Sequence, residues 1–225
     1  MQLFLDDACP QAIRRCLSYF PCDGVTTNPS ILKRAGQAPY PLLQEIRAML
    51  PEEASLHVQV ISETAEEMLA EAKVIRKRIG GNVYIKVPAT AEGIRAMKMM
   101  AAEGVPVTAT AIYTPMQAFL AAKAGAEYAA PYVNRLDNTG MDGVRIAKTI
   151  HDIFTVHGMN CKVLAASFKN IMQIQELCAY GVGSVTAAPE LVEQMLRHPA
   201  VAPAVADFNR DFHTLCGEGQ TMATI

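Results

Sequence analysis

The sequence predicts an α/β protein built as a single closed (β/α)8, or TIM, barrel with an extra C-terminal helix. Short strand-like runs alternate with longer helical segments about eight times along 225 residues. Several runs are apolar on both faces, as in Val163-Leu-Ala-Ala166, which is typical of a parallel sheet covered by helices. No change of composition divides the chain, so we expect one domain spanning residues 1–225. About eight strand–helix units in this length fit a small barrel.

The predicted strands are short runs rich in β-branched and apolar residues, each followed by a helical pattern. They are Gln2 to Leu5, Gly24 to Thr27, Ser55 to Val60, Asn82 to Val87, Pro106 to Ile112, Tyr128 to Val133, Lys162 to Ala166 and Ser184 to Ala187. The run Thr64-Ala-Glu-Glu67 has the pattern of a capping box and predicts a helix that ends near Ile79, before Gly80-Gly81.

An open doubly wound sheet is the alternative arrangement of the same units. It is disfavoured because no G-x-G-x-x-G pattern follows the first strand, and Gly181-Val-Gly183 lacks the third glycine. Beyond the eighth unit, residues 201–216 read as an additional helix with Phe208 and Phe212 one turn apart. This helix either docks on a neighbouring subunit or packs on its own barrel.

Charge and apolar patterning exclude several classes of partner. The formal net charge is −2 and the chain has no basic run, which argues against nucleic acid. The amino terminus reaches Asp6 too early for the apolar region of a signal peptide. The uncharged stretch from Gly104 to Ala122 contains Pro106 and Pro115 and reads as a strand followed by a helix, not as a membrane span. We therefore expect a cytoplasmic protein that acts on small molecules.

The cysteine and histidine positions do not suggest a metal centre. The chain has six cysteines without a C-x-x-C spacing, and its five histidines form no pair at helical spacing. Reduced thiols and no bound metal are the simplest interpretation.

Lys86 is the one charged residue in the apolar run Val83-Tyr-Ile-Lys-Val-Pro88. If its side chain points into a packed interior, the loss of hydration lowers its pKa and supplies a neutral amine, which attacks carbonyl groups. The alternative is a lysine near a strand end whose ammonium group remains in water.

Other polar residues fall at the carboxyl ends of the predicted strands, where parallel barrels carry their chemistry. They are Asp6, Thr26, Asn28, Gln59, Thr110, Tyr132, Arg135 and Ser167. Each also has a structural explanation: Asp6, Asn28 and Ser167 as helix starts, the threonines as ordinary strand residues, Gln59 and Tyr132 as hydrogen-bonded core groups. Arg135 could pair with Asp137 at the surface. Independent structural roles would not place all of them on one rim, so their convergence with Lys86 predicts a site in one cavity.

Four stretches of the chain resemble the transaldolase family, and within it the small fructose-6-phosphate aldolase branch. They are Gly24-Val-Thr-Thr-Asn-Pro-Ser-Ile-Leu32, Ile85-Lys-Val-Pro-Ala-Thr-Ala-Glu-Gly-Ile94, Ala126-Glu-Tyr-Ala-Ala-Pro-Tyr-Val-Asn-Arg135 and Val163-Leu-Ala-Ala-Ser-Phe-Lys169. The resemblance implies a barrel that needs no metal or cofactor, forms a Schiff base with its substrate, and assembles as a pentamer or decamer.

The resemblance also implies a role for each candidate residue. Lys86 matches the Schiff-base lysine and Asp6 its partner carboxylate, while Gln59, Thr110 and Tyr132 match groups that hold and drive a catalytic water. Arg135 and Ser167 match a phosphate-binding pair, and Thr26 and Asn28 match contacts to substrate hydroxyls. Gln59 and Tyr132 stand where transaldolases usually carry Glu and Phe, so both positions resemble the aldolase branch.

A class I aldolase is therefore the expected activity, with reversible cleavage of a ketose phosphate to dihydroxyacetone and glyceraldehyde 3-phosphate. The main alternative is a transaldolase, in which a second aldehyde captures the enamine. Two other classes stay open on the sequence: a pyridoxal-phosphate enzyme that uses the barrel lysine, and a non-catalytic protein that binds sugar phosphates. Departures such as Asn170 and the tail from Gly217 to Ile225 leave the acceptor and donor open.

Overall fold

Eight parallel strands close into a barrel in chain order, with β8 paired to β1. The computed structural model describes residues 1–225. The strands are β1 (Gln2–Asp6), β2 (Gly24–Thr26), β3 (Ser55–Gln59), β4 (Val83–Pro88), β5 (Val107–Ile112), β6 (Tyr128–Pro131), β7 (Lys162–Ala165) and β8 (Ser184–Ala187). This closure confirms the predicted (β/α)8 barrel and excludes the open doubly wound sheet.

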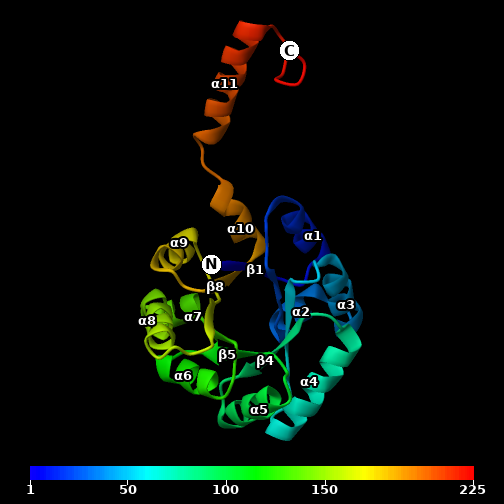
Figure 1. Cartoon of the computed structure of the whole chain (residues 1–225), viewed down its shortest axis with the longest axis vertical. Coiled ribbons are helices and arrows are strands. Elements are labelled where there is room, and N and C mark those ends of the chain that lie inside the picture. Colours follow the sequence, from blue (N-terminus) through cyan, green and yellow to red (C-terminus); the bar gives the residue numbers. More distant parts are fainter. The chain divides into compact units, whose positions relative to one another are not determined.

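Helices surround the strands, as Figure 1 shows. They are α1 (Pro10–Tyr19), α2 (Pro29–Ala35), α3 (Pro39–Met49), α4 (Ala65–Ile79), α5 (Ala91–Ala102), α6 (Pro115–Lys123), α7 (Val133–Asp137), α8 (Gly143–Val156), α9 (Ile171–Tyr180) and α10 (Pro189–Leu196). Two connections carry two helices each, namely β2 to β3 and β6 to β7. The first helix of each pair, α2 or α7, begins close to the carboxyl end of its strand.

Successive side chains along each strand point alternately to the outside and the inside of the barrel, which produces two hydrophobic clusters. Residues such as Leu5, Val25 and Ile85 face outward and belong to the large cluster between the sheet and the helices. Phe4, Tyr128 and their neighbours face inward and form a smaller cluster inside the barrel. Lys86 lies two residues after Tyr84 of this inner cluster, so the same alternation directs its side chain into the barrel.

A buried histidine lies within the inner cluster. One ring nitrogen of His57 is 2.8 Å from the Ser55 hydroxyl, and the other is 2.8 Å from the Thr108 hydroxyl. Its ring stacks on Tyr84 with centroids 4.8 Å apart. The floor beneath Lys86 is therefore packed, and the polar atoms of the histidine ring are satisfied.

The predicted start and end of α4 agree with the structure. The Thr64 hydroxyl accepts a hydrogen bond from the Glu67 backbone, and Gly80 is the C-cap. The Glu67 carboxylate, however, accepts from the Thr64 hydroxyl at 2.8 Å. Reciprocal capping boxes occur instead at α6 and α9, where Gln117 and Gln173 bond back to Thr114 and Asn170.

Two glycines allow close packing around the strands that carry the candidate site. A Cβ atom on Gly24 would lie 2.0 Å from the Ser55 carbonyl oxygen, so only glycine fits at the start of β2. A Cβ atom on Gly93 would lie 1.8 Å from the carbonyl oxygen of Pro88. Gly93 thus lets α5 pack directly against the end of β4, the strand that holds Lys86.

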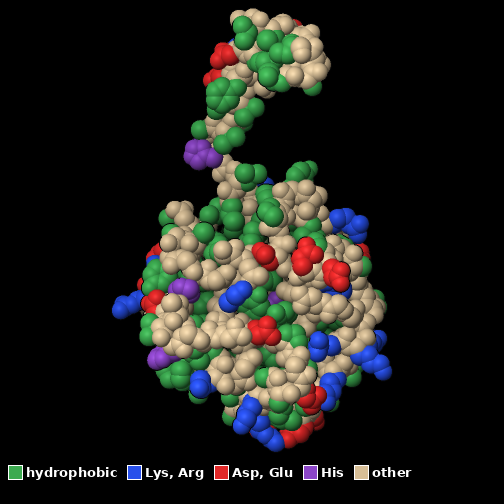
Figure 2. Space-filling model, in the orientation of Figure 1, with side chains coloured by type: hydrophobic (Ala, Val, Ile, Leu, Met, Phe, Trp, Pro, Cys, Tyr) green, Lys and Arg blue, Asp and Glu red, His purple; other side chains and the backbone are tan.

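The chain divides into two compact units, Met1–Val192 and Glu193–Ile225. The second unit contains α11 (Val201–Cys216), which matches the predicted additional helix. None of the residues in α11 is buried, and Phe208 is 70% exposed. None of the helices has both the length and the apolar character that a membrane crossing requires. Acidic and basic side chains are interspersed over the face drawn in Figure 2.

Candidate active site

A cavity of about 240 Å³ opens at the carboxyl ends of the strands. Its lining consists of residues at the ends of six strands and in the segments that follow them: Asp6, Asn28, Ser30, Ile31, Arg34, Lys86, Tyr132, Arg135, Ala166, Ser167 and Ala188. Six of the residues predicted from the sequence line this cavity, namely Asp6, Asn28, Lys86, Tyr132, Arg135 and Ser167.

Lys86 is buried, with 5% of its surface exposed, so the alternative of an ammonium group in bulk water is wrong. Its Nζ donates a hydrogen bond of 2.8 Å to the carbonyl oxygen of Thr27. Burial lowers the pKa of Lys86; the Asp6 carboxylate opposes this shift, and the charge of Arg135 adds to it. A neutral amine is thus more accessible here than on a surface lysine.

Asp6 is held at the end of β1 by a neighbouring strand. The Thr26 hydroxyl donates to Asp6 Oδ1 at 2.8 Å, and Thr26 Oγ1 lies 2.6 Å from Thr186 Oγ1. Burial raises the pKa of Asp6, while the charge of Lys86 and the hydrogen bond from Thr26 oppose this shift. Thr26 is fully buried and does not itself line the cavity, so in this structure it orients the carboxylate.

Tyr132 is connected to β5 by a hydrogen bond of 2.8 Å between its hydroxyl and that of Thr110. Thr110 is completely buried and lies just before Ala111, whose φ is 55°. The β5–β6 register shifts between Ala109 and Ile112. A bulge of this kind changes the direction of a side chain, and here it accompanies the contact between Thr110 and Tyr132.

Arg135 lies over the Tyr132 ring, with its Cζ 4.5 Å from the ring centroid. The surface pair with Asp137 that the sequence allowed is absent, because Asp137 accepts hydrogen bonds from the Gly143 backbone at 2.8 Å and from Gln173 at 2.6 Å. The guanidinium hydrogen-bond donors of Arg135 are therefore available to a ligand.

Ser167 is one of the two non-glycine residues with positive φ, at 62°; the other is Ala111. It does not cap α9, because Asn170 does so. A non-glycine residue in the left-handed region is uncommon and costs about 1 to 3 kcal/mol. Ser167 therefore adopts a strained conformation at the wall of the cavity.

Asn28 and Gln59 differ in how they relate to the cavity. Asn28 lines it and also caps α2, since its side-chain oxygen accepts from the Ile31 backbone at 3.0 Å. Gln59 pairs in register with Lys86 but lines a neighbouring hollow between α2, α3 and α4. The structure thus brings Gln59 beside the strand of Lys86 without placing it on the wall of the cavity.

Sequence reasoning missed Ser30, Ile31 and Arg34, which line the cavity from α2. Ser30 and Arg34 are four residues apart on a helix that starts directly after Asn28, so they share one helical face. The i, i+4 spacing after the Asn-Pro pair was the available signal.

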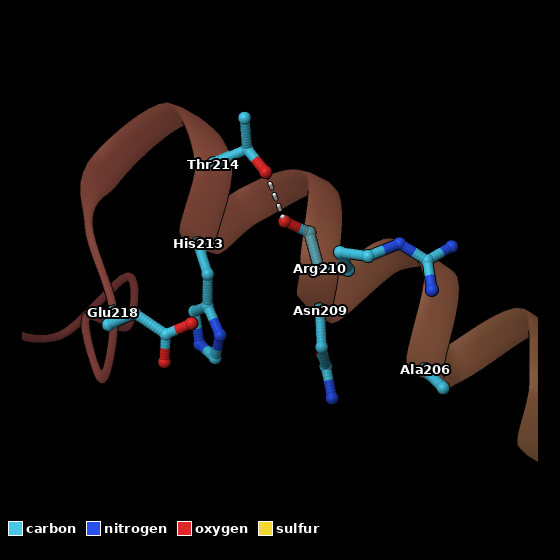
Figure 3. Close-up of a pocket in the computed structure, with 6 residues that line it drawn as sticks. All are labelled: Ala206, Asn209, Arg210, His213, Thr214 and Glu218. Carbon is cyan, nitrogen blue, oxygen red and sulfur yellow. Dashed lines mark hydrogen bonds between the residues drawn. The ribbon is translucent and has the colours of Figure 1, made fainter.

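A larger hollow of about 440 Å³ lies in the unit Glu193–Ile225. Figure 3 shows that its lining, which includes Arg210, His213 and Glu218, comes from α11 and the turn after it. We assign the site to the smaller cavity because polar groups from several strands converge there. The structure has no group of three or more His, Cys, Asp or Glu side chains suited to a metal ion.

A closed parallel barrel with a buried lysine and a carboxylate at the carboxyl ends of its strands has the architecture of a barrel enzyme. The chain belongs to the transaldolase/fructose-6-phosphate aldolase family, whose model matches residues 3–223. It is 38% identical over 216 residues to a protein named probable fructose-6-phosphate aldolase from Streptococcus pneumoniae, an alignment that covers 96% of this chain and 97% of that relative. The resemblance noted in the sequence is confirmed, and at the level of the family the chain is an enzyme of the aldolase type.

Proposed function

We propose that the protein is a class I aldolase that reversibly cleaves a ketose phosphate, fructose 6-phosphate or a close analogue, to dihydroxyacetone and an aldose phosphate. The observation that carries this proposal is the burial of Lys86 in the cavity wall, with a lowered pKa, near the Asp6 carboxylate. The name of the relative from Streptococcus pneumoniae supports the aldolase reaction.

The first step is attack of the Lys86 amine on the C2 carbonyl of the ketose. Loss of water from the resulting carbinolamine gives an iminium ion, which serves as the electron sink for carbon–carbon cleavage. The Asp6 carboxylate stabilises the cationic nitrogen electrostatically and accepts a hydrogen bond from a substrate hydroxyl. Thr26 and Asn28 fit the same donor half of the substrate, Thr26 by orienting Asp6 and Asn28 from the cavity wall.

Cleavage follows when the C4 hydroxyl loses its proton and the C3–C4 bond breaks. The aldehyde leaves, the electron pair forms an enamine, and protonation of the enamine at C3 precedes hydrolysis to dihydroxyacetone and free Lys86. Tyr132 is the group we assign to proton transfer, because its hydroxyl lies in the cavity and is oriented by Thr110. We assign Gln59 to the same proton transfer on the basis of the resemblance and of its register position beside Lys86.

The phosphate of the aldehyde half fits Arg135 and Ser167. A guanidinium group binds a phosphate monoester through two parallel hydrogen bonds, and the Ser167 hydroxyl adds a third donor. Both residues line the same cavity wall, which extends from β6 to β7.

The test is to incubate the protein with fructose 6-phosphate and to measure glyceraldehyde 3-phosphate in a coupled assay, with and without erythrose 4-phosphate. Release of glyceraldehyde 3-phosphate without erythrose 4-phosphate supports the aldolase. Release that requires erythrose 4-phosphate identifies a transaldolase instead, and no release under either condition contradicts both activities. Lys86→Met must abolish the adduct that borohydride traps with dihydroxyacetone.

Lys162→Met is the matched control for that experiment. Lys162 also lies on a barrel strand, but it is exposed and its Nζ donates to Gln2 at 3.4 Å. The control variant must retain the trapped adduct. An adduct that persists in Lys86→Met would assign the imine to a different lysine.

We further propose that the protein is a cytoplasmic homo-oligomer in which α11 docks on a neighbouring copy. A helix with an exposed Phe208 and no buried residue lacks the packing that normally stabilises helices in water. The six cysteines are free thiols, which suits a reducing compartment.

A further inference from the structure

We propose that Arg34 is a second phosphate-binding residue, which approaches the anion from the wall opposite Arg135, so that the phosphate of the substrate is bridged between two guanidinium groups. Arg34 lies on α2, lines the cavity together with Lys86 and Arg135, and was not among the candidates from the sequence. This inference rests on the proposed function, which assigns the phosphate to Arg135 and Ser167.

The order of the strands places the two arginines on opposite sides of the cavity. Arg34 belongs to the helix that follows β2, and Arg135 to the helix that follows β6. In a closed barrel of eight strands, β2 and β6 lie four positions apart in either direction, which is diametrically opposite. Since both side chains line one cavity of about 240 Å³, a ligand in its mouth meets both of them.

The donors of both guanidinium groups are unused within the protein. The guanidinium group of Arg135 lies over the Tyr132 ring, and neither it nor the Arg34 side chain forms a hydrogen bond or an ion pair with another residue. Arg95 and Arg210, in contrast, are each paired with a carboxylate. Available forked donors on two walls suit a phosphate monoester, which offers acceptor oxygens in several directions.

The charge of the cavity supports the same conclusion. Its lining contains three basic side chains, Lys86, Arg34 and Arg135, and one carboxylate, Asp6. Even with a neutral Lys86 the excess of one positive charge favours an anion, and a phosphate monoester carries close to two negative charges at neutral pH. Arg34 and Asp6 interact electrostatically, but at longer range than an ion pair.

The test uses two acceptors that differ only in the phosphate, glyceraldehyde 3-phosphate and glyceraldehyde, each condensed with dihydroxyacetone. Loss of one charge-assisted contact is expected to raise KM for the phosphorylated acceptor about ten- to a hundred-fold in Arg34→Ala, while KM for glyceraldehyde changes less than about three-fold. Arg34→Lys should recover part of the loss, because an ammonium group keeps the charge without the fork.

Lys33→Ala is the matched control, since Lys33 is the adjacent cation on α2 but lines the neighbouring hollow instead. It is expected to leave KM for both acceptors unchanged. The double variant Arg34→Ala with Arg135→Ala should raise KM by less than the product of the two single effects, because both residues bind the same group.

Three results would overturn the inference: an equal loss for both acceptors, a double variant whose effect equals the product of the single effects, or a Lys33→Ala variant as defective as Arg34→Ala. Borohydride trapping of dihydroxyacetone on Lys86 uses no phosphate and therefore tests the proposed function separately. If the adduct forms but Arg34→Ala affects both acceptors equally, the phosphate-binding role of Arg34 alone is refuted. If the unaltered protein forms no adduct, the proposed function is refuted.

Discussion

Replacement of Tyr132 by Phe removes one oxygen atom from the cavity. We expect a small effect on the stability of the fold and a much larger effect on the reaction rate. The lost hydroxyl lies 2.8 Å from Thr110 Oγ1, whose residue is completely buried. Leaving that hydroxyl without its partner costs about 1 to 2 kcal/mol of folding free energy, which corresponds to a fall in Tm of about 2 to 8 °C in a chain of this size. A protein with a typical stability of about 5 to 15 kcal/mol therefore remains folded at 25 °C.

The expected effect on the reaction is much larger than the effect on folding. A general acid or base contributes about 10²- to 10⁴-fold, which equals about 2.7 to 5.4 kcal/mol of activation free energy. We expect kcat for cleavage of fructose 6-phosphate to fall by this factor in Tyr132→Phe. The adduct that borohydride traps between Lys86 and dihydroxyacetone should still form, because the amine and the Asp6 carboxylate remain.

Tyr84→Phe provides the matched control. The Tyr84 hydroxyl donates to Glu127 at 2.8 Å, so the control also loses one hydrogen bond, but among residues at the amino-terminal end of the barrel. Thermal unfolding and kcat should be measured on both variants. If kcat of Tyr132→Phe stays within about three-fold of the unaltered protein, or if both variants lose activity equally, the proton-transfer role of Tyr132 is refuted.

Three further predictions concern titration and assembly. Burial lowers the pKa of Lys86, so the rate of reductive trapping of dihydroxyacetone should level off below pH 10.4, the ordinary lysine value; a rate that still rises beyond it contradicts the shift. Burial, and secondarily the charge of Lys86, lower the pKa of His57 well below its ordinary value, so only the unfolded state takes up this proton as the pH falls below about 6.5. Relative to His57→Phe, the protein should lose about 1 kcal/mol of unfolding free energy between pH 6.5 and 5.5, because the unfolded-state histidine goes from about half to about nine-tenths protonated over that interval. Urea-unfolding free energies that change equally in the two proteins between these pH values would contradict this. A chain that ends at Leu196 should assemble from fewer subunits than the full chain, as counted from the mass by light scattering, and an unchanged number of subunits would show that α11 does not join copies.

The barrel could be predicted because its signals are local and repeated. Each predicted strand overlaps an observed one, and the disagreements are of one or two residues at the ends, as with Val60 and Val133, which lie just beyond β3 and β6. Strand ends depend on hydrogen bonds to neighbouring strands, which no local pattern encodes. The start of α4 was readable from Thr64, because a cap is a contact within one turn of helix.

The candidate site was only partly predictable. Residues on strands were found, because alternation and the parallel sheet determine which end and which face they occupy. Arg34 was missed because its place depends on how α2 lies over the mouth of the barrel. Gln59 was expected in the same cavity as Lys86 and lines a neighbouring hollow, since the packing of side chains decides where one cavity ends and the next begins. The left-handed backbone conformation of Ser167 could not be predicted from the sequence, because glycine is the residue type that usually marks a positive φ.

The packing beneath Lys86 determines the direction from which a substrate can reach its amine. Phe4, His57, Tyr84 and Tyr128 contact one another edge-on or stacked inside the barrel, with ring centroids 4.8 to 6.0 Å apart. Since this layer blocks the amino-terminal end, the cavity at the carboxyl ends is the open approach to Nζ. The same layer withholds water from the ammonium form, and that loss of hydration is the largest cause of the lowered pKa of Lys86. The aromatic floor therefore acts on reactivity as well as on stability: it favours the neutral amine and leaves it open on the side where Asp6, Tyr132, Arg34 and Arg135 line the cavity.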